Sequence, residues 1–213
     1  MTPISETLTY KQLTKNDFLS NAKLTKIATL IYQTDAYISQ AMFLSKEDAL
    51  NVIPELFRRG DKMFHVDNIF VAETFDGDIK GLILWKKGPL HWTSALFHQV
   101  SRDLSIAETP WLSLVQQNYF EEYNQTDSGT IELIDVCVSE DVRGMGIGSA
   151  MISAFIRAHL SDPIMELFVL GDNYSAIRVY EKCGFTKNLL VNGFSIDNRD
   201  LPCIRMQRRI SPP

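Results

Sequence analysis

Hydrophobic and polar positions along the chain follow two spacings, and each spacing predicts one kind of element. Residues 8–14 alternate apolar and polar side chains, which is typical of a short strand. Apolar residues return every third or fourth position over residues 20–32, as on one face of a helix. The runs at 130–138 and 164–171 are largely apolar on both faces, which indicates buried strands. The pattern therefore predicts an α/β protein.

A helix and a hairpin are predicted between the first helix and these buried strands. Residues 46–60 have an amphipathic pattern, and Pro54 is expected to kink or divide this helix because proline lacks an N–H group. The stretches 68–75 and 79–86 are rich in β-forming residues and flank Asp-Gly-Asp at 76–78, a strong turn signal. We expect two neighbouring antiparallel strands here.

Residues 88–129 have a weaker pattern, which favours two helices near 93–105 and 110–123. The chain shows no repeat, linker or low-complexity tract, so we expect a single domain over 1–213 with a helical insertion at 88–129. The C-terminal part is expected to hold a helix and two strands, at 173–185, near 185–196 and near 203–210.

Composition and charge limit the kinds of molecule that the protein is expected to bind. Of the 213 residues, 45% are hydrophobic and 22% are charged, as in ordinary globular proteins. The net charge is −5, so we expect neither nucleic acid nor a membrane as a partner. The sequence shows no secretory signal and no segment of membrane-spanning length. Cys137, Cys183 and Cys203 lie far apart among apolar neighbours, which favours reduced packing residues, no metal site and a cytoplasmic protein.

Three glycines, Gly144, Gly146 and Gly148, lie between a buried strand and an apolar helical segment, directly after Arg143. The first turn of a helix has unpaired N–H groups and a partial positive charge, and glycines let an anion approach them closely. A triphosphate-binding P-loop would need a lysine after the last glycine, where Ser149 stands. The spacing also differs from the dinucleotide fingerprint. Taken alone, the loop fits either a phosphate site or a turn without a ligand.

Two longer stretches resemble a known family. The stretch "IDVCVSEDVRGMGIGSAMISAFI" resembles motif A of the GNAT N-acetyltransferase superfamily, with Arg143, Gly146 and Gly148 at the positions of its loop pattern, whereas Gly144 is less constrained by it. The stretch "NYSAIRVYEKCGF" resembles motif B, and the resemblance covers about 131–186. It implies a mixed, largely antiparallel central sheet of about seven strands, flanked by helices and splayed between the fourth and fifth strands.

The resemblance also implies acetyl-CoA as the co-substrate, without a metal. Its pyrophosphate would bind the N–H groups of Gly144 to Ser149, and its pantetheine arm would pair with the backbone of Val136 to Val138. Asn173 is expected to contact the cofactor and to cap its helix. The expected cofactor-binding residues are Val136, Cys137, Val138, Arg143, Gly144, Met145, Gly146, Ile147, Gly148, Ser149 and Asn173.

Acetyl transfer to an amine needs a group that removes a proton and a group that stabilises the leaving thiolate. Tyr180 lies two helical turns after Asn173 and is the candidate proton donor, with a packing tyrosine as the alternative. Glu132 is the leading candidate for the base. Asp135 and a water molecule are the other candidates, and strand alternation would point Asp135 away from the face of Glu132.

The acceptor is the least defined part. Tyr32, Asp35 and Tyr37 lie in the stretch 31–43, within the segment after the first strand where the family forms one wall of its acceptor pocket, and they are candidates for binding an amine by charge and cation–π contact. A connection with packing tyrosines would explain them equally well. We expect an N-acetyltransferase acting on a small-molecule amine, peptide or protein, with a homodimer as one expected assembly. The alternatives are a non-catalytic acyl-CoA-binding regulatory module, and transfer of a longer acyl group or to a hydroxyl.

Overall fold

The computed structural model describes residues 8–17, 19–60, 63–88, 95–109, 126–196 and 199–209, without the side chains of 36 and 189–199. Its strands are β1 (Thr9–Gln12), β2 (Ile69–Glu73), β3 (Ile79–Lys87), β4 (Thr130–Val138), β5 (Ile164–Leu170), β6 (Thr186–Ile196) and β7 (Arg199–Arg209). Its α-helices are α1 (Asn21–Thr34), α2 (Ala36–Met42), α3 (Lys46–Arg59), α4 (Ala95–Asp103), α6 (Ile147–Ala158) and α7 (Tyr174–Lys182).

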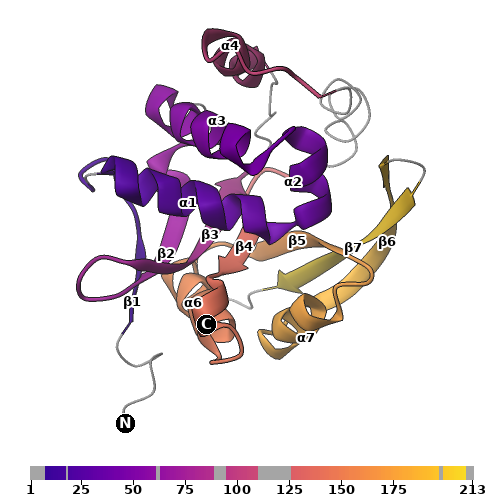
Figure 1. The fold of residues 1–213 in the computed structure, drawn as a ribbon. Helices are drawn as coiled ribbons and strands as arrows, with labels where there is room; N and C mark the ends of the chain where they lie inside the picture. Colours follow the sequence, from indigo (N-terminus) through magenta and orange to yellow (C-terminus); the bar gives the residue numbers. More distant parts are fainter. Residues whose placement is uncertain are drawn as a thin grey trace.

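The strands form one seven-stranded sheet in the order β1-β2-β3-β4-β5-β7-β6. Each neighbouring pair is antiparallel except β4 and β5, which run parallel with α6 between them in the chain. Helices α1, α2 and α3 cover one face of this sheet, and α6 and α7 cover the other (Figure 1). The predicted mixed, largely antiparallel sheet flanked by helices is therefore confirmed.

Strands β4 and β5 separate at their C-terminal ends. Their pairing covers Thr130 to Leu133 on β4 and Ile164 to Leu167 on β5. Both strands continue beyond this point, β4 to Val138 and β5 to Leu170. The predicted splay between the fourth and fifth strands is thus present, and it opens towards the glycine-rich loop that follows β4.

A β-bulge interrupts the alternation of β4. Leu84 of β3 pairs with Asp135, whereas the next residue of β3 pairs with Leu133, so Ile134 is an extra residue in β4. Leu133 packs in the core cluster that includes α6, and Cys137 packs in the cluster beneath α1 and α3. Regular alternation would place these two side chains on one face. The bulge has reversed the faces of the second half of the strand.

This reversal corrects one sequence-based expectation. Glu132 and Asp135 lie on the same face of β4, towards α1 and α2, rather than on opposite faces, and both line one pocket. The alternation rule fails because it assumes one residue per step of the ladder, and the extra residue at Ile134 shifts everything after it by one step.

Most of the predicted elements are present, with two differences. The segment after α1 forms a separate short helix, α2, which the periodicity does not predict. Helix α3 continues through Pro54 as one element rather than dividing, and it ends at Gly60, whose φ is 66°.

Helix α4 lies within the first helix predicted for 88–129, whereas the helix predicted near 110–123 falls outside the described residues. A single domain with an insertion at 88–129 stays a prediction.

Candidate active site

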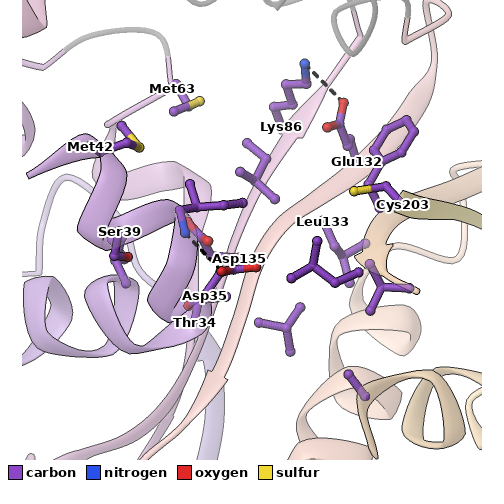
Figure 2. A pocket seen from close by; sticks show the side chains of 18 of the residues that line it. Thr34, Asp35, Ser39, Met42, Met63, Lys86, Glu132, Leu133, Asp135 and Cys203 are labelled. Atoms are coloured by element: carbon purple, nitrogen blue, oxygen red, sulfur yellow. Dashed lines mark hydrogen bonds and ion pairs between the residues drawn. The ribbon is translucent and has the colours of Figure 1, made fainter. Parts of the chain in front are cut away.

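A pocket of about 240 Å³ lies where β4 and β5 separate. One wall comes from β4 and β5 with the start of α7, and the opposite wall comes from α1, α2, α3 and α4. Figure 2 shows that polar side chains from β3, β4 and the α1–α2 junction point into the same space. The splay of the two strands has thus produced a cavity between the sheet and the layer of helices that covers this face.

The glycine-rich loop begins α6 without a side-chain cap. Gly144 and Gly146 both have a φ of 78°, in the left-handed region that other residues rarely adopt, and Gly146 is the N-cap of the helix. Gly146 has no side chain that could cap the first turn, so the N–H groups of Ile147, Gly148 and Ser149 lack an intrahelical partner, whereas Ala150 N–H donates to the Gly146 carbonyl at 3.0 Å. Such a turn is suited to a phosphate group.

Gly148 differs from the other two glycines. It lies within the first turn of α6, and a Cβ at this position would meet Val138 Cγ2 at 3.6 Å and Val179 Cγ1 at 4.0 Å, which are ordinary contacts. The sequence pattern gave most weight to Gly146 and Gly148. The backbone conformation adds a separate requirement, since a positive φ favours glycine at Gly144 and Gly146, while the weight of Gly144 in the motif stays a prediction.

The other residues of the loop differ in how exposed their side chains are and in which groups they contact. Met145 is half exposed, whereas the Ile147 side chain is buried in the core, which leaves its backbone as the part available to a ligand. Arg143 Nε donates to the Val138 carbonyl at 3.0 Å, and its Nη1 lies 3.7 Å from Glu140 Oε1. The Arg143 guanidinium is half exposed, so its charge faces solvent beside the loop. The Ser149 carbonyl lies 3.8 Å from Cys183 Sγ.

The backbone of β4 offers hydrogen-bonding groups to the splay at alternate residues. Ser139 N–H donates to the Lys80 carbonyl on β3 at 2.8 Å. Along a strand, the N–H and C=O groups of one residue point to one side, and those of the next residue point to the other side. Val136 and Val138 therefore face the open side, while Cys137 is paired with β3. Of the three residues expected to bind a pantetheine arm, two have the required orientation, and Cys137 does not.

Asn173 and Tyr180 both line the pocket from α7. Asn173 Oδ1 caps the helix by accepting from Ala176 N–H at 3.2 Å, as predicted. Tyr180 is 8% exposed and packs against Phe185, with 6.0 Å between ring centroids. Burial raises the pKa of the Tyr180 phenol, and the charge of Asp135 raises it further, so this hydroxyl keeps its proton at neutral pH.

Asp35 and Asp135 lie side by side in the pocket, one from the α1–α2 junction and one from β4 (Figure 2). Burial raises the pKa of Asp135 to about 7, and the nearby charge of Asp35 adds to this effect. The pKa of Asp35 is raised chiefly by burial as well. Two carboxylates in one apolar space repel each other, so they readily hold a proton or a cation between them.

Glu132 has a different environment. Its Oε2 lies 3.1 Å from Lys86 Nζ and accepts a hydrogen bond from the Thr126 hydroxyl at 2.5 Å. Burial raises the pKa of Glu132 overall, although Lys86 and Thr126 act against this, and at this separation from Lys86 we assign the ionised form. Glu132 is thus held in a buried ion pair, with its Oε2 engaged by both Lys86 and Thr126.

The three acceptor candidates separate in the structure. Asp35 lines the pocket, but Tyr32 and Tyr37 are not among its lining residues. Tyr32 packs against the core cluster of α1 and α3, and Tyr37 is 46% exposed. The structure therefore provides no cation–π wall from these tyrosines. Sequence reasoning missed Lys86 and Thr126, because no motif marks residues that become neighbours of Glu132 only through strand pairing.

Two kinds of feature are absent from the described ranges. Among these residues, no group of three or more His, Cys, Asp or Glu side chains is arranged to hold a metal ion. Within the same part of the chain, no helix combines the length and apolar character needed to cross a bilayer.

Comparison with protein families gives one match. Residues 110–185 match the model of the "Acetyltransferase (GNAT) family". Among curated proteins, a mycothiol acetyltransferase of Corynebacterium jeikeium is 35% identical over 68 residues, which are 30% of this chain and 20% of the relative. This chain therefore matches about a fifth of the length of that protein.

Solved structures share the fold over almost the whole chain. An N-acetyltransferase from Staphylococcus aureus aligns with a TM-score of 0.64 at 15% identity, covering 93% of this chain and 99% of the other. A Corynebacterium glutamicum protein described as "histone acetyltransferase HPA2 and related acetyltransferase" aligns with a TM-score of 0.61 at 20% identity, covering 97% and 98%. At these identities the likeness concerns the fold, and it agrees with the resemblance of the two sequence motifs.

Proposed function

For a chain that belongs to the GNAT acetyltransferase superfamily, we propose acetyl-CoA-dependent transfer of an acetyl group to a primary amine. The observation that carries the proposal is that four features lie around the place where β4 and β5 separate. The uncapped first turn of α6, the open backbone edge at Val136 and Val138, the Tyr180 phenol and the Asp135 carboxyl all lie around the splay of β4 and β5.

The glycine loop and the open edge fit the two parts of acetyl-CoA. The N–H groups of Gly146 to Ser149, with Arg143 beside them, suit a pyrophosphate because they combine unpaired donors with a partial positive charge. Both backbone groups of Val136 and the N–H group of Val138 suit the amides of pantetheine, which would lie along β4 like an added strand, while the Val138 carbonyl accepts from Arg143 Nε at 3.0 Å. When bound there, the thioester would supply the acetyl group at the pocket.

Asp135 is the proton acceptor that we assign. An amine enters at neutral pH as an ammonium ion and must lose a proton before its nitrogen can attack the thioester carbonyl carbon. A carboxyl with a pKa of about 7 can take that proton near neutral pH, and Asp135 faces the pocket. The nitrogen–carbon bond then forms as the carbon–sulfur bond breaks.

Tyr180 is the group that we assign to the leaving sulfur. Its raised pKa keeps the hydroxyl protonated, so it can donate a hydrogen bond to the thiolate as negative charge develops there. The ring is held by Phe185 and by the surrounding core, which fixes the direction of the hydroxyl. The nitrogen loses a second proton as it becomes an amide; Tyr180 gives its own proton to the sulfur and is reprotonated by this second proton through solvent, and Asp135 returns the first proton to solvent.

A panel assay tests this function. Release of free thiol from acetyl-CoA is followed with small amines, amino acids, peptides and alcohols as acceptors, and binding of CoA is measured by calorimetry. We expect CoA to bind and at least one amine to be acetylated. CoA binding without turnover of any acceptor would support a non-catalytic acyl-CoA-binding module instead. Absence of CoA binding would contradict both functions.

We also propose that the enzyme works in the cytoplasm. Cys137, Cys183 and Cys203 are all buried. Such cysteines are typical of a reducing compartment, where they act as packing residues. Comparison of acetyl transfer in soluble and membrane fractions of the source cells, and in their secreted medium, would test the location.

A further inference from the structure

Most of the helical side of the pocket is apolar, apart from Thr34, Asp35 and Ser39 near the α1–α2 junction. We call its apolar side chains the apolar wall, and they come from α2, the residues after α2 and α3, and α4. The apolar wall consists of Ile38, Met42, Phe43, Met63, Phe64 and Phe97. A ligand group against these residues loses its water without gaining a polar partner, so the wall favours an uncharged, apolar body.

The charged side chains that line the described part of the pocket are Asp35, Lys86, Glu132 and Asp135. Lys86 and Glu132 form an ion pair with 3.1 Å between Nζ and Oε2, and their charges offset each other. Asp35 and Asp135 remain as two acidic groups next to the apolar wall, and the charge of each faces the other. The pocket lining therefore carries an excess of negative charge at Asp35 and Asp135.

We propose, on the basis of the N-acetyltransferase function above, that the acceptor is a monoamine with one primary ammonium group on an uncharged alkyl or aryl body. The ammonium binds between Asp35 and Asp135, and the body lies on the apolar wall. A second ammonium group or a carboxylate on the body would be desolvated against this wall without a partner, because Glu132 and Lys86 are paired with each other.

Asp35 is held in place by its own helix cap. Its Oδ1 accepts from Tyr37 N–H at 3.0 Å and from Ile38 N–H at 3.1 Å at the start of α2. Both bonds use the same oxygen, so we assign Oδ2 to the ammonium. Asp35 is in this arrangement a binding residue for the acceptor, while Asp135 takes the proton.

Three acceptors of matched length test the charge rule with the wild-type enzyme: n-hexylamine, hexamethylenediamine and ε-aminocaproate. We expect kcat/KM for n-hexylamine to exceed that of the other two by about 100-fold, because each carries a second charge that loses its water on the apolar wall. Equal or faster turnover of the diamine or the amino acid would overturn the monoamine assignment and leave the acetyltransferase function intact. Absence of turnover with every amine of the wider panel would overturn both.

Asp35→Asn tests the ammonium site itself, because the asparagine Oδ1 can still cap α2. We expect the KM for n-hexylamine to rise by about 10- to 100-fold with little change in kcat, as for loss of a charged hydrogen bond. The control is Asp78→Asn, which removes an acidic group paired with Lys80 at 2.8 Å on the exposed β2–β3 turn. An unchanged KM in Asp35→Asn, or an equal rise in the control, would contradict the role of Asp35.

Discussion

Glu132 and Asp135 lie on the same face of β4, three positions apart, because the bulge at Ile134 adds a residue between them. The two carboxyl groups share a pocket but differ in their partners. Glu132 is paired with Lys86, whereas Asp135 faces a second carboxylate, Asp35. Position on the strand thus makes both groups candidates for the base, and their surroundings assign this role to Asp135.

Asp135→Asn is expected to lower kcat by about 100- to 10,000-fold, the range for loss of a general base. In the wild-type enzyme the base must be deprotonated, so the rate should rise with pH and level off above the Asp135 pKa of about 7. Steady-state rates between pH 5 and pH 9 check both points. A variant that keeps the wild-type rate and pH profile would exclude Asp135 as the base.

The same substitution is expected to change how stability depends on pH. The pKa of Asp135 is raised from 3.8 to about 7, so its contribution to stability is complete below pH 3.8 and is lost as pH rises through 7. Asp135→Asn should therefore have a higher Tm than the wild type at pH 8, with the difference shrinking towards pH 4. Thermal denaturation of both proteins across this range measures the effect. A constant difference would show that the Asp135 carboxyl titrates alike in the folded and unfolded states.

Tyr180→Phe is expected to lower kcat by about 10- to 1,000-fold, as for loss of one donor to developing negative charge. Folding should survive, because the ring that packs against Phe185 is retained. Tyr174→Phe is the matched control, since Tyr174 lies on the same helix and is 67% exposed. Acetyl transfer and thermal denaturation are measured for both. Equal rates in the two variants would leave Tyr180 as a packing residue.

The glycine loop offers a comparison between two positions. Gly146→Ala should destabilise the fold by about 1–2 kcal/mol, because φ is 78° there. Gly148→Ala should leave the free energy of unfolding within about 1 kcal/mol of the wild type, since the helical position has room for a methyl group. Chemical denaturation checks stability, and calorimetry checks affinity for CoA. Weaker CoA binding by the stable Gly148→Ala variant is expected if the pyrophosphate approaches this turn, and unchanged affinity would argue against that position.

Much of the fold could be predicted from local patterns. Periodicity identified the strands and α1, α3, α6 and α7, because a buried face imposes a regular spacing on each of them. The splay was implied by the resemblance of two motifs, whose glycines and Asn173 mark the ends of helices. These features depend on neighbours in the chain, which a sequence displays directly.

The chemistry of the pocket could be predicted only in part. The bulge at Ile134 has no signature in the sequence, so alternation assigned Asp135 to the wrong face. The contacts of Glu132 with Lys86, and of Asp35 with Asp135, join residues far apart in the chain, and only strand pairing and helix packing bring them together. Tyr32 and Tyr37 illustrate the same limit, because the sequence left an amine site and packing tyrosines as equal alternatives, and in the structure neither tyrosine lines the pocket.

The pair of Lys86 and Glu132 gives a stability test that also concerns the base. Lys86 is 4% exposed and Glu132 is 7% exposed, so Lys86→Met would leave a buried carboxylate without its cation. We expect a loss of about 3–5 kcal/mol in the free energy of unfolding. Combining Lys86→Met with Glu132→Gln should recover most of it, because glutamine is neutral and its carbonyl can still accept from Thr126.

Chemical denaturation measures the recovery, and acetyl transfer by the double variant decides between the two carboxyl groups. If Asp135 is the base, the refolded double variant should keep kcat within about 10-fold of the wild type, since only a supporting pair has been replaced. A stable double variant with kcat reduced as far as in Asp135→Asn would return the role of the base to Glu132. The position of Glu132 in the pocket would then matter more than its partner, and the ion pair with Lys86 would have to open during the reaction.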